Sequence, residues 1–429
     1  MRVLLTNRSL DQRAGSELYL FELATRLLAR GHSPVAFSPR LGKVAAALRE
    51  ATIPVVDDLG AIGEPPDLIH GQHHTAAMTA LLHFPGVPAV YVCHGWKPWE
   101  ETPPRFPRIL RYVAVDYTTR ERLVSEQGIP PERVEVVLNF VDLDRFRPRP
   151  PLPPKPRRAL VFSNQASERT FLPAVREACE RLGIALDVAG VASGDPMERP
   201  EEQLPGYDLV FAKARAALEA MAVGAAVVLC DQAGAGPLVT SAELDQLRPL
   251  NFGIRTLRNP VTADHLVSQI ELYDPADAAE VSRRLRAVAG IEEAVDRMTA
   301  LYEEVLAEHR KKGNPPAVEE SRAAAAYLRW LSPYLEERSE LMGEREGWKD
   351  QALHWHAQTS QLLAEREEHN AQWLAEREGV GAEMDHLRKE MQALQSTATW
   401  RLRERLLRMN SLRRAYRWVR GVGRGKSGS

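Results

Sequence analysis

The sequence predicts an α/β protein with two doubly wound domains that face a cleft, followed by an α-helical C-terminal extension. Short apolar runs alternate with amphipathic helical stretches, and this pattern starts again after a proline-rich segment. A length of 429 residues suits two or three domains. With 44% hydrophobic residues and a net charge of −2, the chain can build packed cores but has no overall charge that would favour nucleic acid or a membrane.

Residues 1–150 are expected to form the first domain, with a Rossmann-like fold. Residues 16–30 place apolar side chains at helical spacing, and Gly31 follows them, which predicts a helix that ends there. Short apolar runs on either side predict the strands of a parallel sheet. The predicted strands cover residues 2–5, 34–37, 68–70, 89–93, 112–115 and 134–138.

A stiff linker is predicted for residues 147–158, RPRPPLPPKPRR, because proline at this density excludes helix and central strand. After this hinge the alternation restarts, so residues 151–312 are expected to form a second Rossmann-like domain. The helix-rich stretch 275–312 is expected to close that domain. The other predicted elements are strands at 159–163, 185–189, 209–211 and 226–230 and helices at 173–182 and 214–223.

Residues 313–395 are polar and favour helix, so they predict a helical extension. Apolar residues recur every seven positions in two blocks, which is typical of a coiled coil, and the eleven-residue step between the blocks matches a four-residue stutter. Four glycines weaken this prediction, so a single solvated helix or a partly disordered tail is the alternative. A coiled coil would make the protein a homo-oligomer. The apolar positions are Leu341, Trp348, Trp355, Leu362, Trp373, Val380, Leu387 and Leu394.

Residues 396–429 predict a basic amphipathic helix with a flexible end. From residue 400 onward the chain has ten Lys or Arg and one Glu. We expect residues 400–420 to bind an anionic membrane surface. Nucleic-acid binding would require a recognised fold that this run lacks, and packing on a protein partner is the third alternative.

The protein is expected in the cytoplasm, where its basic tail could reach the inner face of the membrane. No run of about 18 apolar residues occurs, and the apolar start of the chain is too short for a signal peptide. The spacing of Cys93, Cys179 and Cys230 matches neither a zinc site nor a redox pair, which suits a reducing compartment.

Residues 208–231 give the strongest local signal for ligand binding, because they read strand, loop, helix, glycine and strand. In open α/β sheets, ligands bind at the carboxyl ends of strands, where the amides of the following helix attract anions. Lys213 and Arg215 would add positive charge beside a diphosphate. Glu219, one turn into the helix, could accept two hydrogen bonds from a ribose diol.

Residues 219–231, EAMAVGAAVVLCD, resemble the EAMA-x-G-x-P-V-V segment of GT-B glycosyltransferases, family 4 in particular. The resemblance implies transfer of a sugar from a nucleotide-sugar to an acceptor, usually with retention of configuration and with neither metal nor other cofactor. It assigns Glu219 to the donor ribose. Gly234 and Gly236, in GAGP, are similar to the family's G-G-x-P-E loop, whose backbone lies near the donor sugar or phosphates.

The first domain carries further parts of the resemblance, which covers residues 1–312. Gly15, Ser16 and Glu17 follow the first predicted strand and are similar to the family's G-G-x-E loop, which implies contact with the acceptor or with donor phosphate. Residues 131–148 are similar to the family's segment before the domain crossover. Asp142 and Asp144 there have a D-x-D spacing, for which we expect capping and hinge contacts instead of metal binding.

His70 and His94 end predicted strands that are similar to the family's D-V-V-H and V-x-T-x-H-G motifs. Both are expected to face the cleft, with His94 as the candidate catalytic residue and Trp96 beside the acceptor. His73 and His74 are expected in the loop that follows. No carboxylate or cysteine completes a metal site with these histidines, so no zinc is predicted.

Three places depart from the family's pattern. Phe211 stands where the family usually has a second Glu that reaches the donor sugar, and Leu238 replaces the Glu of G-G-x-P-E. The loop 163–166, SNQA, lacks the Arg and Lys that usually contact the diphosphate, which leaves Asn164 as its donor-site candidate. These changes leave the donor and the stereochemical outcome open.

The resemblance therefore implies a glycosyltransferase of bacterial surface-polysaccharide or glycoconjugate synthesis, with a glycan, a lipid-linked molecule or another acceptor. Residues 396–414 are also similar to the S-x-x-W-R-L…L-R ending of many bacterial surface-polysaccharide glycosyltransferases. A nucleotide-sugar epimerase and a catalytically silent scaffold that recruits partners through its tail are the alternatives. An epimerase would convert the donor without an acceptor, whereas a scaffold would bind no nucleotide.

Overall fold

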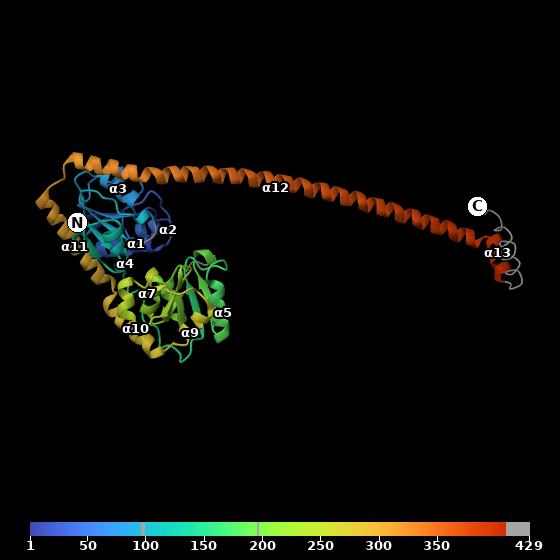
Figure 1. Ribbon diagram of the computed structural model, residues 1–429, viewed down its shortest axis with the longest axis horizontal. Helices are drawn as coiled ribbons and strands as arrows, with labels where there is room; N and C mark the ends of the chain where they lie inside the picture. The colour runs from blue at the N-terminus through green and yellow to red at the C-terminus, as the bar shows by residue number, and fades with distance from the viewer. Residues whose placement is uncertain (96–98, 195–196, 409–429) are drawn as a thin grey trace, which may run out of the picture. The chain divides into compact units, whose positions relative to one another are not determined.

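The computed structural model describes residues 1–95, 99–194 and 197–408. The chain forms two units, Met1–Trp330 and a second that begins at Leu331. The first unit contains two β-sheets with helices on both faces, which we call the first and second lobes (Figure 1).

The first lobe contains a parallel sheet of seven strands in the order β3-β2-β1-β4-β5-β6-β7. The order reverses between β1 and β4, and such a switch point is where ligands bind in open α/β sheets. The short β3 and the helix α2 were not predicted. The elements are β1 (Arg2–Thr6), α1 (Gly15–Ala29), β2 (Ser33–Phe37), α2 (Lys43–Glu50), β3 (Val55–Val56), β4 (Leu68–Gln72), α3 (His74–His83), β5 (Ala89–Cys93), β6 (Ile109–Ala114), α4 (Tyr117–Glu121) and β7 (Val134–Val136).

The second lobe contains a mixed sheet of five strands in the order β12-β11-β10-β8-β9, in which β12 runs antiparallel to β11. The prediction of a loop at Gly234–Leu238 was wrong, because this segment is the edge strand β12. The other elements are β8 (Arg158–Phe162), α5 (Leu172–Leu182), β9 (Ala185–Ala189), α6 (Pro200–Gln203), β10 (Leu209–Ala212), α7 (Ala214–Val223), β11 (Ala226–Asp231), α8 (Leu244–Leu247), α9 (Ala263–Ile270) and α10 (Pro275–Val288).

Alternate residues of the strands face two apolar layers in each lobe, as expected for sheets covered on both sides. In the first lobe, α1 and α2 pack on one face and α3 on the other. In the second lobe, α7 and α10 pack on one face and α5 and α9 on the opposite one (Figure 1).

Helix α11 (Ile291–Lys312) packs on the first sheet, although the sequence placed it in the second domain. Its buried stripe includes Val295, Met298 and Tyr302, which join the cluster that contains α1 and α2. The chain crosses between the lobes twice at one place, because Val141 N donates to Ala289 O at 2.8 Å and Ile291 N donates to Val141 O at 3.1 Å.

The proline-rich segment is attached to the second lobe and is therefore not the free hinge that we expected. Arg149 N donates to Val223 O at 2.9 Å, and its guanidinium contacts Asp208 Oδ1 at 3.0 Å. Arg157 N donates to the other oxygen of Asp208 at 2.9 Å. The two paired segments around Val141 and Gly290 are consequently where the chain passes between the lobes.

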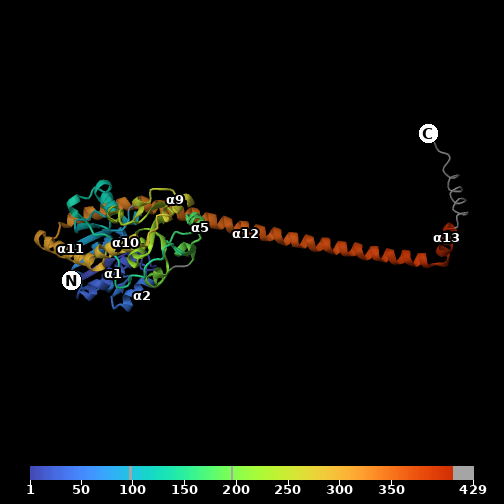
Figure 2. The same ribbon diagram turned by 90° about the horizontal axis from the view of Figure 1, so that it is seen from below.

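Helix α12 (Ala317–Ser396) is 80 residues long and has no buried residue; both views show it unbroken (Figures 1 and 2). Its start contacts the first lobe: Arg108 Nε donates to Glu320 Oε1 at 2.7 Å, and the Tyr327 hydroxyl lies 2.7 Å from His74 Nδ1. Helix α13 (Ala398–Arg408) follows, and the rest of the predicted basic helix lies outside the described residues. Among the described helices, none is long and apolar enough to cross a membrane.

Candidate functional site

The carboxyl edge of the first sheet brings together polar side chains that are far apart in the sequence. The segments after β1, β4 and β5 supply Asn7, His73 and His94. Between them lies Glu101, whose Oε2 accepts a hydrogen bond from His94 N at 2.9 Å and whose Oε1 lies 3.4 Å from His73 Nε2. Burial acts to raise the pKa of Glu101, but the two histidines outweigh it and lower that pKa. Nothing in the sequence marked Glu101 as part of the site.

His94 lies at this edge, as the sequence predicted. Its Nε2 is 2.8 Å from Gln72 Oε1, and the ring of Tyr19 meets its ring edge-on with centroids 4.6 Å apart. Burial lowers the pKa of His94 to about 4, so the ring is neutral near pH 7. With Nε2–H donating to Gln72, the lone pair on Nδ1 stays available to accept a proton.

The prediction that His70 faces the cleft was wrong, because its side chain is fully buried. Strand β4 continues to Gln72, and α11 covers His70, with its Nδ1 2.6 Å from the Tyr302 hydroxyl. The loop predicted for His74 was also wrong, because this residue begins α3 and is buried.

The N-terminus of α1 holds the predicted Gly15, Ser16 and Glu17. Gly15 starts the helix in open space, since no heavy atom lies within 4 Å of a Cβ built on it. The Ser16 hydroxyl donates to Glu17 Oε2 at 2.9 Å. Trp96 lies outside the described residues.

Several buried polar atoms at the facing edges lack a hydrogen-bond partner in the part of the chain that the structure describes. They are Asn7 Nδ2, Gln72 Nε2 and Glu22 Oε2. An unsatisfied buried polar atom costs about 1–3 kcal/mol. Such atoms are therefore candidates to contact a polar ligand.

Glu219 is 5% exposed and belongs to an ion-pair cluster that joins the two lobes. Arg215 Nε donates to Glu219 Oε1 at 2.8 Å, and the same guanidinium contacts Glu22 of α1. Arg145 approaches Glu22 Oε1 at 3.4 Å. Burial raises the pKa of Glu219, although Arg215 opposes the shift. Burial disfavours the charge of Arg215, but Glu22 and Glu219 outweigh it and raise its pKa.

Lys213 and Asn164 lie at neighbouring strand ends of the second sheet. Lys213 precedes α7 and forms an ion pair with Asp231, which is buried at the end of β11. The side-chain oxygen of Asn164 accepts a hydrogen bond from Val191 N at 3.2 Å, so this residue holds the turn after β9. Asp231 was missed by the sequence reasoning.

Gly234 and Gly236 lie in the buried edge strand β12, away from any open loop. A Cβ at Gly236 would lie 2.6 Å from Thr256 O, and one at Gly234 would lie 2.9 Å from Asn259 O. These glycines are needed for close backbone packing, which explains their presence without a ligand.

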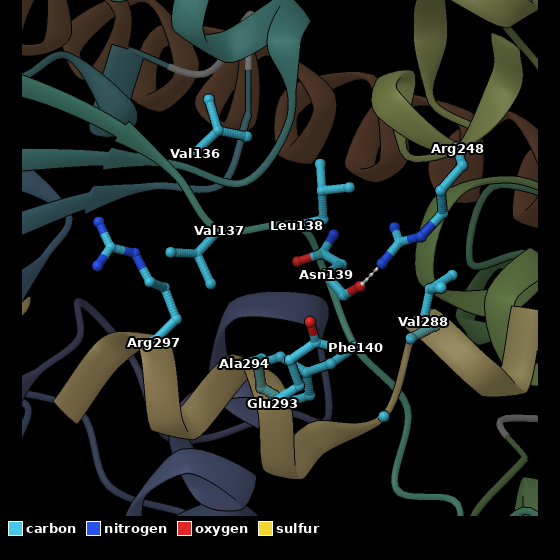
Figure 3. A pocket seen from close by; sticks show the side chains of 12 residues that line it. Val136, Val137, Leu138, Asn139, Phe140, Arg248, Val288, Glu293, Ala294 and Arg297 are labelled. Atoms are coloured by element: carbon cyan, nitrogen blue, oxygen red, sulfur yellow. Dashed lines mark hydrogen bonds between the residues drawn. The ribbon is translucent and has the colours of Figure 1, made fainter. Parts of the chain in front are cut away.

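A pocket of about 190 Å³ lies beside the lobe crossover (Figure 3), and neither His94 nor Glu219 is among its lining residues. Its lining includes Phe140, Glu293 and Arg248. Arg248 donates to Asn139 O at 2.7 Å, and burial lowers the pKa of its guanidinium to about 10. The contact joins the two lobes, so the pocket is part of the hinge region.

Comparison with known proteins supports this architecture. Residues 13–145 match the family model described as Glycosyltransferase Family 4. Comparison with curated protein sequences gives no match. A glycosyltransferase from Rickettsia africae is similar in structure, with a TM-score of 0.54 at 14% identity over 71% of this chain and 98% of that chain. HepE from Anabaena, in a structure with UDP-glucose, has a TM-score of 0.52 at 15% identity over 71% of this chain and 100% of that chain.

At these identities the structural likeness establishes the fold alone. The chain therefore has the two-lobed GT-B fold of glycosyltransferases, with a first lobe that matches Glycosyltransferase Family 4 and a long helix that follows the second crossover.

Proposed function

We propose that this protein transfers a sugar from a nucleotide-sugar donor to an acceptor bound between its lobes. The observation that carries the proposal is the cluster of Glu219, Arg215 and Glu22, which brings the candidate donor helix against the first lobe. The family match of the first lobe agrees with this function. HepE was solved with UDP and with UDP-glucose, so a UDP-sugar is the first donor to test.

The donor binds the second lobe in this proposal. Glu219 accepts hydrogen bonds from the ribose, while Arg215 and Lys213 turn toward the diphosphate together with the first amides of α7. Both cations are held by carboxylates, Arg215 by Glu22 and Glu219 and Lys213 by Asp231. Donor binding therefore exchanges ion pairs, and the diphosphate replaces the carboxylates as the partner of these cations.

The acceptor binds the first lobe near Gly15, His94 and Gln72. The neutral His94 can take the proton of an acceptor hydroxyl at Nδ1 if the reaction inverts configuration. The family's usual course, retention without metal, remains our expectation. The cations of the second lobe would then stabilise the leaving nucleoside diphosphate in place of a metal ion.

The cellular role that we propose is synthesis of a bacterial surface polysaccharide or glycoconjugate from the cytoplasmic side. Residues 400–420 would hold the protein at the anionic inner face of the membrane, near a lipid-linked or growing glycan acceptor. Flotation of the chain with anionic and with neutral vesicles tests this part separately from activity. Loss of residues 400–429 should abolish binding to the anionic vesicles.

A catalytically silent scaffold is the second candidate, because Glu219 is already paired and Phe211 replaces the family's second Glu. Calorimetry with UDP, GDP and their sugars, followed by a donor panel with and without acceptor glycans, separates the candidates. Nucleotide binding with acceptor-dependent release of the nucleoside diphosphate supports the transferase. Binding to no nucleotide favours the scaffold, and donor conversion without acceptor favours an epimerase.

A further inference from the structure

Helix α12 carries a row of large apolar side chains that lie exposed on its surface. Trp348, Trp355 and Trp373 are 69%, 65% and 54% exposed. Apolar side chains that stay exposed to water contribute no hydrophobic stabilisation to the helix. A long helix of this kind is therefore typically stabilised by a partner that covers the row. The chemistry of this helix identifies the partner.

The spacing of the row gives a heptad register, with the seven-residue positions at d. In the second block, a and d are both large and apolar over 380–394, in the order Val380, Met384, Leu387, Met391 and Leu394. All five are exposed in the single chain. Alternating steps of four and three over three turns or more are typical of a coiled-coil seam.

The residues at a and three of the four glycines agree with this register. Arginines occupy three a positions, Arg345, Arg366 and Arg377, and charged residues there favour few strands because their ends must reach water. Gly343, Gly347 and Gly379 fall at f and c, on the outside of a coiled coil, whereas Gly381 falls at e beside the seam. The stutter between Leu362 and Trp373 keeps the apolar seams of the two heptad blocks on the same side of the helix.

The charges beside the seam select the direction of the partner. Acidic residues occupy g and never e, and the two basic residues beside the seam, Lys349 and Arg388, lie at e. In a parallel pair, g of one helix meets e of the next heptad in the other, which joins Glu344 with Lys349 and Glu383 with Arg388. An antiparallel pair would instead set g against g, and therefore Glu against Glu. The acidic g positions are Glu344, Glu365, Glu376, Glu383 and Glu390.

We propose that α12 binds a second copy of this chain as a parallel, in-register, two-stranded coiled coil over residues 341–394. Arg388 pairs weakly with Asp385 of its own helix at 3.2 Å in an exposed position, so it is available to Glu383 of the other copy. This inference does not depend on the proposed enzymatic activity, because it rests on residues of α12 alone.

Sedimentation velocity of the full chain should show a dimer at micromolar concentration. Leu387→Lys, at d, should weaken the dimer about 100-fold, because two buried leucines are lost per dimer. Ala382→Lys introduces the same side chain at f and should leave the dimer intact. A monomeric wild-type chain, or equal effects of the two variants, would overturn the proposal, and circular dichroism checks that both variants stay helical.

Direction is tested by charge reversal and by cross-linking. Glu383→Lys or Arg388→Glu alone should weaken the dimer several-fold, and the double variant should restore it. Under oxidation, Leu394→Cys should give a disulfide-linked dimer, because equivalent residues meet only in a parallel, in-register pair. The native cysteines are buried and do not compete. Failure of both the rescue and the cross-link would refute the parallel arrangement.

Discussion

Arg215 Nε donates a hydrogen bond to Oε1 of Glu219 at 2.8 Å, within a cluster that excludes most solvent. The same guanidinium contacts Glu22 of the first lobe, so one cation neutralises two buried carboxylates from different lobes. A cluster of this kind fixes the lobes relative to each other only while the cation is present. It therefore connects lobe closure with the binding of an anionic ligand that competes for Arg215.

Replacing Arg215 by Met should destabilise the protein by about 3 kcal/mol, because it removes the cation shared by two buried carboxylates, of which Glu22 keeps its contact with Arg145. Urea unfolding measures the change in the free energy of unfolding. Arg181→Met is the matched control: Arg181 pairs with Asp264 at 2.8 Å on the exposed surface, and its loss should cost at most about 1 kcal/mol. Equal costs for both variants would show that the Arg215 cluster is not a buried ion pair.

Glu219→Gln should reduce kcat/KM for the donor about 10- to 100-fold, because a hydrogen bond to a charged group contributes about 1.5–3 kcal/mol. The amide keeps the size of the side chain, so the fold should persist. Glu271→Gln, an exposed position in the same lobe, should leave the kinetics unchanged. Calorimetry should show that the loss lies in nucleotide affinity, and an unchanged dissociation constant would remove Glu219 from the ribose.

The sequence predicted most elements of both sheets to within a few residues, because apolar periodicity is a local property. It did not predict that α11 packs on the first sheet. An apolar helical stripe such as Val295, Met298 and Tyr302 suits either sheet, and only the second crossover at Gly290 decides between them. The edge strand β12 was missed because glycine and proline usually indicate a loop.

The candidate site was predictable where a motif placed a residue at a strand end, as for His94 and Lys213. Glu101 was not predictable, since it ends a short 3-10 helix, Trp99–Glu101, and reaches the site by accepting a hydrogen bond from His94 N. The sequence did contain an indication for Glu22, because this carboxylate lies between apolar residues that are buried in α1. The sequence could not show that it meets Arg215, because that contact forms only when the lobes assemble.

Acid should destabilise the protein between about pH 6.5 and pH 4. Burial lowers the pKa of His70 to about 3 and those of His74 and His94 to about 4. The unfolded chain, with histidines near 6.5, therefore binds more protons in this range, so the free energy of unfolding falls as pH falls. Each fully buried histidine contributes at most about 1.4 kcal/mol per pH unit.

The variant His70→Gln tests this prediction, because the amide can still bond to Tyr302 but does not titrate. Urea unfolding at pH 7, 6 and 5 should give a shallower decrease than the wild type. His354→Gln, on the exposed surface of α12 and at c of the proposed register, should keep the wild-type decrease. An unaltered slope in His70→Gln would mean that His70 is protonated equally in both states.

Gly190→Ala should destabilise the second lobe and weaken donor binding together. Gly190 has a φ of +154°, and a Cβ there would lie 2.0 Å from Ser163 O, so the backbone that carries Asn164 must move. Gly183→Ala is the control, since its φ of +68° costs about 1–2 kcal/mol but its Cβ meets no atom within 4 Å. We expect Gly190→Ala to cost at least about 1 kcal/mol more than the control in urea unfolding, because overpacking adds to the conformational cost. Nucleotide affinity should fall only in Gly190→Ala, and an equal fall in Gly183→Ala would assign the effect to stability instead of to the loop at Asn164.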